Sequence, residues 1–385
     1  MKSLSSPFQK SQIDKVYKRA KDEGRLPLEI SGTDGYARYY AMDNISRDEV
    51  RLIVTYSEDR AKEIYEAFHF FDRNILYYPA KDVLFYSADI HGHTILAQRM
   101  EVIRAILEDR VTTVVVSFDA LLNKVVPIDE VKKHVIKLKT GDTLNLEEIK
   151  RALVSEGYER NDWVDGVGQF TIRGGIMDIF PMSSDCPYRI ELWGEDVDSI
   201  RSFDAESQRS IENVDTLSIY PAAEMILDEE RIASGIKKID REHKAYAKKL
   251  KDAFQTEEYA RINREIAALK EELSYFHSAM GIDGYIGAFY EELHSFLSYM
   301  PEDCVVLIDD PAKVIHRGEL CRLEFQESMK GRLEGGYMLP SQADVLFDYV
   351  DILARLEKLH TVTFSVLGEK NEYLVPKKKC ELETR

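Results

Sequence analysis

The sequence lacks the features of a secreted, disulfide-linked or membrane-spanning protein. Its four cysteines are widely spaced, so they predict neither metal-ligand pairs nor a disulfide framework, and free thiols in a reducing compartment are the favoured interpretation. No apolar run approaches the roughly 20 residues needed to cross a bilayer. The first residues, Met1 to Pro7, lack the apolar core of a signal peptide. We therefore expect a cytoplasmic protein that does not associate with a membrane. The cysteines are Cys186, Cys304, Cys321 and Cys380.

An excess of basic residues is also missing. The 385 residues include 52 Lys and Arg against 69 Asp and Glu, which gives a formal net charge of −17. Such a chain repels phosphate backbones unless a local basic patch overrides the overall field. One basic cluster, Lys248-Lys249-Leu250-Lys251, lies on a predicted charged helix. It could contact DNA, but a solvated helix face is the favoured interpretation, and nucleic-acid binding is not the default expectation.

The length predicts two or three domains, and residues 1–124 have the pattern of a parallel α/β domain. Val111 to Phe118 is rich in β-branched residues, which is typical of a strand buried on both faces. Thr94 to Glu108 has apolar residues at helical spacing. Strands and helices alternate throughout this part, as in βαβ units. Further strands are predicted at Pro27 to Ser31, Arg51 to Tyr56 and Ile75 to Tyr78, and further helices at Ser11 to Asp22 and Asp59 to Phe71.

Residues 125–217 predict a separate, small α+β domain. A helix from Leu146 to Glu156 precedes three short runs of alternating apolar residues, which surround a Gly-Gly pair and a Pro-rich turn. This pattern is typical of a β-meander. Because side chains alternate along a strand, Arg189, Glu191 and Trp193 are predicted to share one face.

Residues 218–350 predict a helix-rich, charged segment and then a return to the α/β domain, and residues 351–385 predict a C-terminal strand followed by a linker or tail. Spaced Glu, Lys and Arg residues support solvated helices. The tail from Lys377 to Arg385 is predicted to lack regular structure. The predicted elements are helices at Ile236 to Phe254, Thr256 to Phe276 and Tyr349 to Leu359, and strands at Val305 to Ile308 and Thr361 to Val366.

The residues after the first strand occupy the place of a phosphate-binding loop but depart from its pattern of Gly, four residues and Gly-Lys-Ser/Thr. Gly32 fits the first position, whereas Ala37, Arg38 and Tyr39 replace the second glycine, the lysine and the small hydroxyl. Ala37 adds a Cβ where the backbone would approach phosphate, Arg38 is a planar fork rather than a point charge, and Tyr39 is too bulky to ligate magnesium as a small hydroxyl does. Asp34 adds a negative charge to the would-be anion nest.

The second half of such a site would be an acidic pair after a buried strand. Asp309 and Asp310 follow Val305 to Ile308 and have that arrangement. Asp309 could ligate magnesium, while Asp310 is one methylene shorter than the glutamate expected to orient water. We therefore interpret the loop as degenerate, and we expect no ATP hydrolysis, no cofactor and no metal.

The block from Tyr158 to Phe203, with Gln208-Arg209 after it, resembles the N-terminal, UvrB-like module of the bacterial transcription-repair coupling factor family. The resemblance covers about residues 20–350. It implies a divided helicase-like α/β domain with a degenerate P-loop and a parallel sheet, into which a small α+β domain is inserted, plus a helix-rich segment. Supporting motifs are Tyr78-Pro79 with Asp82, Arg99, and Phe296 to Pro301 before the Asp309 strand.

The resemblance also implies a function, which is docking onto UvrA through the small domain. Family contacts involve two arginines and one aromatic residue, and the matching positions are Arg173, Arg189 and Trp193. Two guanidiniums suit bidentate pairing with carboxylates, and tryptophan suits an apolar pocket. The alternatives are an intra-domain salt bridge for each arginine and a core position for Trp193.

We therefore expect a repair adaptor without catalytic activity of its own, formed by the N-terminal part of a longer protein. ATP and magnesium would serve motor domains outside this chain. RNA polymerase and DNA would bind other domains, and a C-terminal domain could mask the UvrA-docking face. The stretch from Phe85 to Arg99 is short and has only two aromatics, so a wedge that threads DNA is not expected. The alternatives are a UvrB-like, ATP-dependent DNA-binding helicase fragment and an interaction protein with a partner other than UvrA.

Overall fold

The computed structural model describes residues 12–81, 91–276, 281–368 and 371–382. Much of the stretch in which no DNA-threading wedge was expected, from Phe85 to Arg99, lies outside the described residues. Its last part belongs to helix α4. None of the helices within the described ranges combines the length and the apolar character that a membrane crossing requires.

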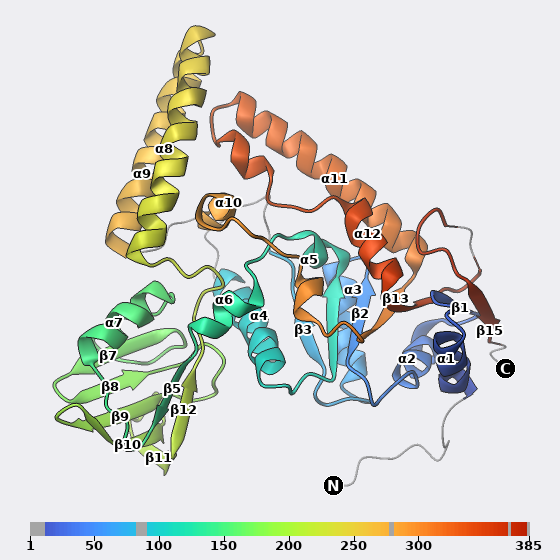
Figure 1. Ribbon diagram of the computed structural model, residues 1–385, viewed down its shortest axis with the longest axis horizontal. Helices are drawn as coiled ribbons and strands as arrows, with labels where there is room; N and C mark the ends of the chain where they lie inside the picture. The colour runs from blue at the N-terminus through green and yellow to red at the C-terminus, as the bar shows by residue number, and fades with distance from the viewer. Residues whose placement is uncertain (1–11, 82–90, 277–280, 369–370, 383–385) are drawn as a thin grey trace.

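A seven-stranded sheet forms the larger domain, and every pair of neighbouring strands in it is parallel (Figure 1). The strand order is β15-β1-β14-β13-β2-β4-β3. Strands β13 and β14 follow the insertion in sequence but lie between β1 and β2, so the domain is divided as the sequence predicts. The strands are β1 (Leu28–Ser31), β2 (Arg51–Thr55), β3 (Leu76–Tyr78), β4 (Thr113–Ser117), β13 (Val305–Asp309), β14 (His360–Phe364) and β15 (Lys378–Glu381).

Both faces of this sheet are buried. Along β2, Leu52 and Val54 enter one apolar core cluster, whereas Ile53 between them enters a second cluster. This explains why the central strands are continuous apolar runs, because a strand with helices on both faces has no solvent side. The surrounding helices are α1 (Gln12–Asp22), α2 (Gly35–Asp43), α3 (Glu58–Phe68), α4 (His91–Leu107), α5 (Phe118–Leu122), α11 (Pro311–Glu334) and α12 (Tyr349–Lys358).

The small domain is built on a six-stranded sheet with the order β11-β10-β9-β8-β7-β6, and the strands from β7 to β11 pair antiparallel in sequence order. The predicted meander is therefore confirmed. A two-stranded ribbon of β5 and β12 lies beside it. The elements are α6 (Ile128–Lys133), β5 (Ile136–Lys139), α7 (Leu146–Ser155), β6 (Glu159–Arg160), β7 (Gln169–Arg173), β8 (Ile176–Ile179), β9 (Tyr188–Trp193), β10 (Asp196–Phe203), β11 (Ser210–Asn213) and β12 (Thr216–Ile219).

Two long helices, α8 (Glu229–Asp252) and α9 (Thr256–Phe276), form an antiparallel hairpin that rises away from the large sheet (Figure 1). The sequence predicts both. Their buried faces meet through Ile232, Ile239 and Leu250 of α8 and Ile262 and Ile266 of α9. The short elements that follow are η1 (Ile282–Tyr285), α10 (Ile286–Phe289), η2 (Phe296–Tyr299) and η3 (Pro340–Ala343).

The prediction of an irregular C-terminal tail is wrong. Residues 378–381 form strand β15, which pairs in parallel with β1 at the edge of the large sheet. This strand was not predicted, because a run of lysines is typical of a solvated tail. Charged residues, lysine above all, are nevertheless common on edge strands, where they discourage pairing with other chains.

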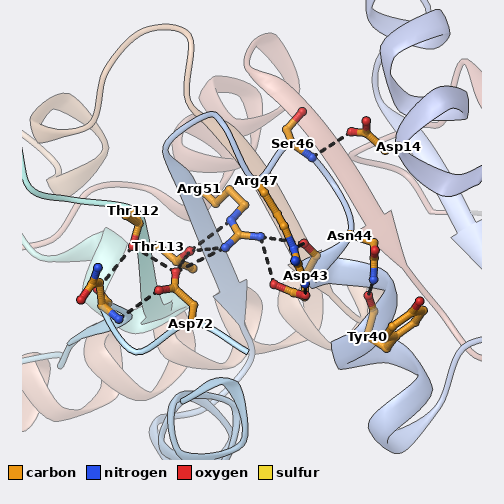
Figure 2. A network of polar contacts seen from close by, with 11 residues as sticks. Asp14, Tyr40, Asp43, Asn44, Ser46, Arg47, Arg51, Asp72, Thr112 and Thr113 are labelled. Atoms are coloured by element: carbon orange, nitrogen blue, oxygen red, sulfur yellow. Dashed lines mark hydrogen bonds and ion pairs between the residues drawn. The ribbon is translucent and has the colours of Figure 1, made fainter. Parts of the chain in front are cut away.

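A buried arginine organises the amino ends of the central strands (Figure 2). Arg51, at the start of β2, donates to the Thr113 hydroxyl at 2.7 and 3.1 Å and to the Asp43 carbonyl oxygen at 3.0 Å. Its guanidinium also lies 3.4 Å from the Asp72 carboxylate. Burial lowers the pKa of Arg51 to about 10, although Asp72 acts in the opposite direction. The network thus joins β2 and β4 to the end of α2 and to the loop that holds Asp72.

A second buried ion pair holds the chain where it leaves the small domain. Arg99 of α4 is fully buried, donates to both carboxylate oxygens of Glu224 and to the Pro79 carbonyl oxygen at 2.6 Å, and lies over the Tyr78 ring. Lys81 is 3.0 Å from the same carboxylate. Burial acts to raise the pKa of Glu224, but Arg99 and Lys81 outweigh it and lower the pKa to about 2.

Glu156, at the carboxyl end of α7, is a buried acid without such a partner. One of its oxygens accepts no hydrogen bond, and the other is 3.8 Å from His134 Nδ1. Burial raises its pKa from the ordinary 4.5 to about 8. In the folded protein Glu156 therefore keeps its proton over a pH range in which the unfolded chain has lost it.

We predict that the free energy of unfolding falls as pH rises from 4.5 to about 8, by at most about 1.4 kcal/mol per pH unit from this group. Glu156→Gln should remove that dependence and raise stability near pH 8. Urea unfolding of both proteins across this range measures the difference. His134, whose pKa is lowered by burial and by Arg231, acts in the opposite direction but is present in both proteins. Parallel pH curves for the two proteins would contradict the assignment.

Candidate docking surface and degenerate phosphate loop

The strands of the small domain present two faces of different character. Phe170, Met177 and Ile190 point to the inner face and pack in the core with Leu153 of α7. The opposite face, called here the outer face, carries Thr171, Arg173, Ile176, Asp178, Arg189, Glu191 and Trp193. Strand pairing sets Asp178 beside both Thr171 and Arg189, and it sets Ile176 beside both Arg173 and Glu191. The prediction that Arg189, Glu191 and Trp193 share one face agrees with this register.

Asp178 holds the two predicted arginines together. Its carboxylate is 1% exposed and accepts from Arg189 Nε at 2.7 Å, Arg189 Nη2 at 2.9 Å and Arg173 Nη2 at 3.0 Å. The intra-domain salt bridge considered as an alternative therefore exists for both arginines. The side chains still remain 42% exposed for Arg173 and 21% for Arg189. Since each guanidinium has more N–H donors than these bonds use, both keep donors for a partner.

The outer face also gathers both tryptophans of the chain. Trp193 is 84% exposed and Trp163 is 61% exposed. Trp193 is therefore not a core residue. The Arg173 guanidinium lies 4.9 Å from the centre of the Trp163 ring, in cation–π contact. The sequence analysis did not single out Trp163. The signal that could have found it is that tryptophan is rare in this chain, which has only two.

Glu191, the second acid that β8 and β9 place on this face, is also paired. Glu191 accepts from the Ser199 hydroxyl at 3.2 Å and forms an ion pair with Arg201. Burial acts to lower the pKa of Arg189, but its hydrogen bond to Asp178 has the larger effect and raises it. Both predicted arginines thus carry positive charge next to exposed indole rings, and strands hold them in place.

The phosphate-like loop after β1 is closed by contacts within the protein. Its backbone N–H groups at Gly32 and Thr33 donate to the carbonyl oxygens of Val366 at 3.1 Å and Ser365 at 3.3 Å. Gly32 has φ of +81°, and a Cβ there would lie 2.2 Å from the Leu382 carbonyl oxygen. The glycine is therefore required by the close approach of the C-terminal strand, and these two amides, which would face a phosphate, already have acceptors.

Arg38 and Tyr39 point into the protein. The buried Arg38 guanidinium donates to the Thr33 carbonyl oxygen at 2.9 Å and to Asp309 Oδ1 at 2.6 Å. The Tyr39 ring packs in the second core cluster, and its hydroxyl donates to Glu63 at 3.0 Å while accepting from Arg60 at 2.8 Å. Ala37 is exposed on α2 and lies away from this network.

Asp309 is fully buried at the end of β13. Besides Arg38, it accepts from Arg60 Nε at 2.8 Å and from the Thr55 hydroxyl at 2.9 Å. Burial acts to raise its pKa, but these arginines, Arg60 first, outweigh burial and lower it. Arg60 and Thr55 were not predicted, because nothing in the sequence pairs them with a residue so distant along the chain.

These residues do not fit a nucleotide with magnesium. Both oxygens of Asp309 are occupied by protein donors, and Asp310 caps helix α11, where it accepts from the Lys313 amide and pairs with the Lys313 ammonium at 3.0 Å. Across the described ranges, no group of three or more His, Cys, Asp or Glu side chains is placed to hold a metal ion. The loop keeps the position of a phosphate site, but its Gly32 and Thr33 amides and the Arg38 guanidinium are engaged within the protein.

Comparison with known proteins finds a family model that matches part of the chain. Residues 136–225 match the family model of the UvrB interaction domain, which is the small domain described above. The chain is 34% identical over 268 residues to the transcription-repair-coupling factor of Bacillus subtilis, covering 70% of this chain and 22% of the relative. It is 32% identical over 344 residues to UvrABC system protein B of Fervidobacterium nodosum, covering 82% of this chain and 51% of the relative.

A further relative is the transcription-repair-coupling factor of Staphylococcus aureus, with 26% identity over 330 residues and coverage of 82% of this chain and 26% of the relative. The chain thus spans about half or less of the length of these relatives. Residues 136–225 thus match the UvrB interaction domain, and most of the chain is similar to transcription-repair-coupling factors and to UvrABC system protein B.

Proposed function

We propose that this chain is an adaptor module of transcription-coupled nucleotide excision repair and that its outer face docks UvrA. The observation that carries the proposal is the grouping of both tryptophans with the Arg173–Asp178–Arg189 cluster on one exposed sheet face of the UvrB interaction domain. Tryptophan and arginine dominate binding energy at protein interfaces. The relatives named for transcription-repair coupling and for the UvrABC system support the pathway.

The arrangement of the face specifies a complementary partner surface. Carboxylates on the partner would accept from the free N–H groups of Arg173 and Arg189, and an apolar pocket would take the Trp193 ring. Asp178 holds both guanidiniums before binding, so less side-chain entropy is lost on association. RNA polymerase recognition, translocation on DNA and masking of this face by a C-terminal domain would belong to other parts of a longer protein.

The chain itself would bind no nucleotide and hydrolyse no ATP. In support of this, Arg38 and Arg60 fill the coordination of Asp309, and the loop amides donate to Ser365 and Val366. The alternative function, an ATP-dependent UvrB-like helicase fragment, would require these bonds to break and the C-terminal strand to move. The similarity to UvrABC system protein B is the reason to test this alternative.

We predict that Trp193→Ala and Arg189→Ala each weaken binding to purified UvrA by roughly 1–3 kcal/mol. Isothermal titration calorimetry measures the change. Arg151→Ala is the matched control, because Arg151 is an exposed arginine on α7, which covers the opposite face of the same sheet. It should leave the affinity unchanged.

Thermal unfolding separates binding from folding in this series. Arg189→Ala removes two of the three hydrogen bonds to the buried Asp178 and should lower the melting temperature, whereas Trp193→Ala alters an exposed ring and should not. If Trp193→Ala and Arg189→Ala both bind UvrA as tightly as the unaltered chain, the outer face is not the docking surface. If the unaltered chain does not retain UvrA at all in a pull-down, the partner is another protein.

We predict that a fluorescent ATP analogue with magnesium shows no saturable binding up to about 1 mM, the upper end of ordinary enzyme–substrate affinities. The amides of Gly32 and Thr33 and both carboxylate oxygens of Asp309 already have partners within the protein. Thermal unfolding with unlabelled ATP should likewise show no stabilisation, because a ligand that binds only the folded state raises its stability. Saturable binding that is lost in Arg38→Ala would favour the helicase alternative.

A further inference from the structure

Helix α8 carries a line of basic side chains on its solvent-facing side. Lys237, Arg241, Lys244, Lys248 and Lys251 follow one another at alternating intervals of four and three residues. At 3.6 residues per turn, this spacing places them along a single face. All are exposed. These five residues are called here the basic stripe.

The basic stripe lies opposite the face by which α8 packs on α9. Ile232, Ile239 and Leu250 form that buried face, and helical geometry sets the stripe about half a turn away. In Figure 1 the hairpin stands clear of the large sheet. Because all five side chains are exposed, the stripe is accessible along its length, which is about 21 Å from Lys237 to Lys251 at 1.5 Å per residue.

The two acids of α8 within this stretch have other partners. Asp240 lies at the edge of the stripe, one turn from both Lys237 and Lys244, whereas Glu242 lies off it. Asp240 pairs with Lys270 at 2.9 Å, and Glu242 accepts from the Ser341 amide at 2.7 Å.

Two other basic residues of α8 have partners, since Lys238 pairs with Glu291 and Arg231 with Glu130, whereas no ion pair is formed by Lys249 among the described residues. By contrast, over the ranges that the structure describes, none of the stripe's side chains takes part in an ion pair, although acidic residues outnumber basic ones in the chain. Five unpaired cations in one line are therefore a local exception to the acidic character of the protein.

The composition of the stripe favours a polyphosphate partner over a protein or a membrane. Protein interfaces are depleted in lysine and have an apolar centre, whereas the stripe is mostly lysine and has no large exposed apolar residue between its ends. Insertion into a membrane surface needs an apolar helix face, and α9 covers that of α8. A row of cations of this length matches the evenly spaced phosphates of duplex DNA.

We propose that the basic stripe of α8 binds the phosphate backbone of duplex DNA, without sequence preference and separately from the outer face. The negative charge of the rest of the chain does not prevent this, because charges more than about 8–10 Å apart are largely screened at physiological salt. The chain would then hold DNA on the helical hairpin while the small domain holds its protein partner.

Fluorescence anisotropy of a labelled duplex of mixed sequence, titrated with the chain at several salt concentrations, tests the proposal. If the stripe contacts up to five phosphates, the slope of log affinity against log salt should be no steeper than about −4.5. Lys244→Ala and Lys248→Ala should each weaken binding severalfold and make the slope shallower by about 1. The substituted side chains are exposed, so circular dichroism should be unchanged.

Lys249→Ala is the matched control. Lys249 is exposed and next to Lys248 but lies off the stripe. Its substitution removes the same charge as Lys248→Ala does. It should weaken binding much less than Lys248→Ala does. Equal effects of the two variants would mean diffuse attraction and would overturn the proposal, as would the absence of DNA binding by the unaltered chain at low salt.

The two surfaces can be told apart in the same assays. The stripe variants should leave UvrA affinity unchanged, and Trp193→Ala should leave DNA affinity unchanged. Loss of UvrA binding in Lys244→Ala, with DNA binding intact, would show that the stripe is a protein-docking surface and would overturn the proposal. Failure of the chain to bind UvrA would refute the proposed function without affecting this result.

Discussion

The buried carboxylate of Asp309 joins the two halves of the divided sheet. It stands at the end of β13, which follows the inserted domains, whereas Arg38, Thr55 and Arg60 all precede them. Removing one partner of a buried ion pair is strongly destabilising, because the other charge is left uncompensated. The chain must therefore return from the insertion to this place for the sheet to close. The same bonds occupy the carboxylate that would ligate magnesium, so this stabilising contact would also account for the proposed lack of nucleotide binding.

Periodicity alone predicts much of the fold. The β-branched run at Val111 to Phe118, the meander and the two charged helices were visible because each is a local pattern whose period reflects its burial. The partners within the sites were not visible. Arg60 and Asp178 act through residues that the fold brings to them, and neither stands out among the many charged residues of the sequence. The lysine-rich strand β15 was missed for the opposite reason, since its local composition suggests a tail and its pairing with β1 is decided by the tertiary structure.

The candidate surfaces lie on separate parts of the molecule and have different physical character. On the outer face, strands fix Arg173 and Arg189 around one buried acid and leave indole rings exposed, which suits a specific protein partner. On α8, the basic stripe consists of long, mobile side chains without an apolar centre, which suits a charged polymer whose sequence is not read. The Arg99–Glu224 pair anchors the chain between them.

The placement of the tryptophans has a spectroscopic consequence. Trp163 and Trp193 are the two tryptophans of the chain, and both are largely in contact with water on the outer face. Indole emission of the isolated chain therefore originates from this one surface, at the red-shifted wavelengths of solvated rings. Quenching by a small solute such as acrylamide would report how open the surface is, with no introduced label. The rest of the molecule, including the helical hairpin, is silent in such a measurement.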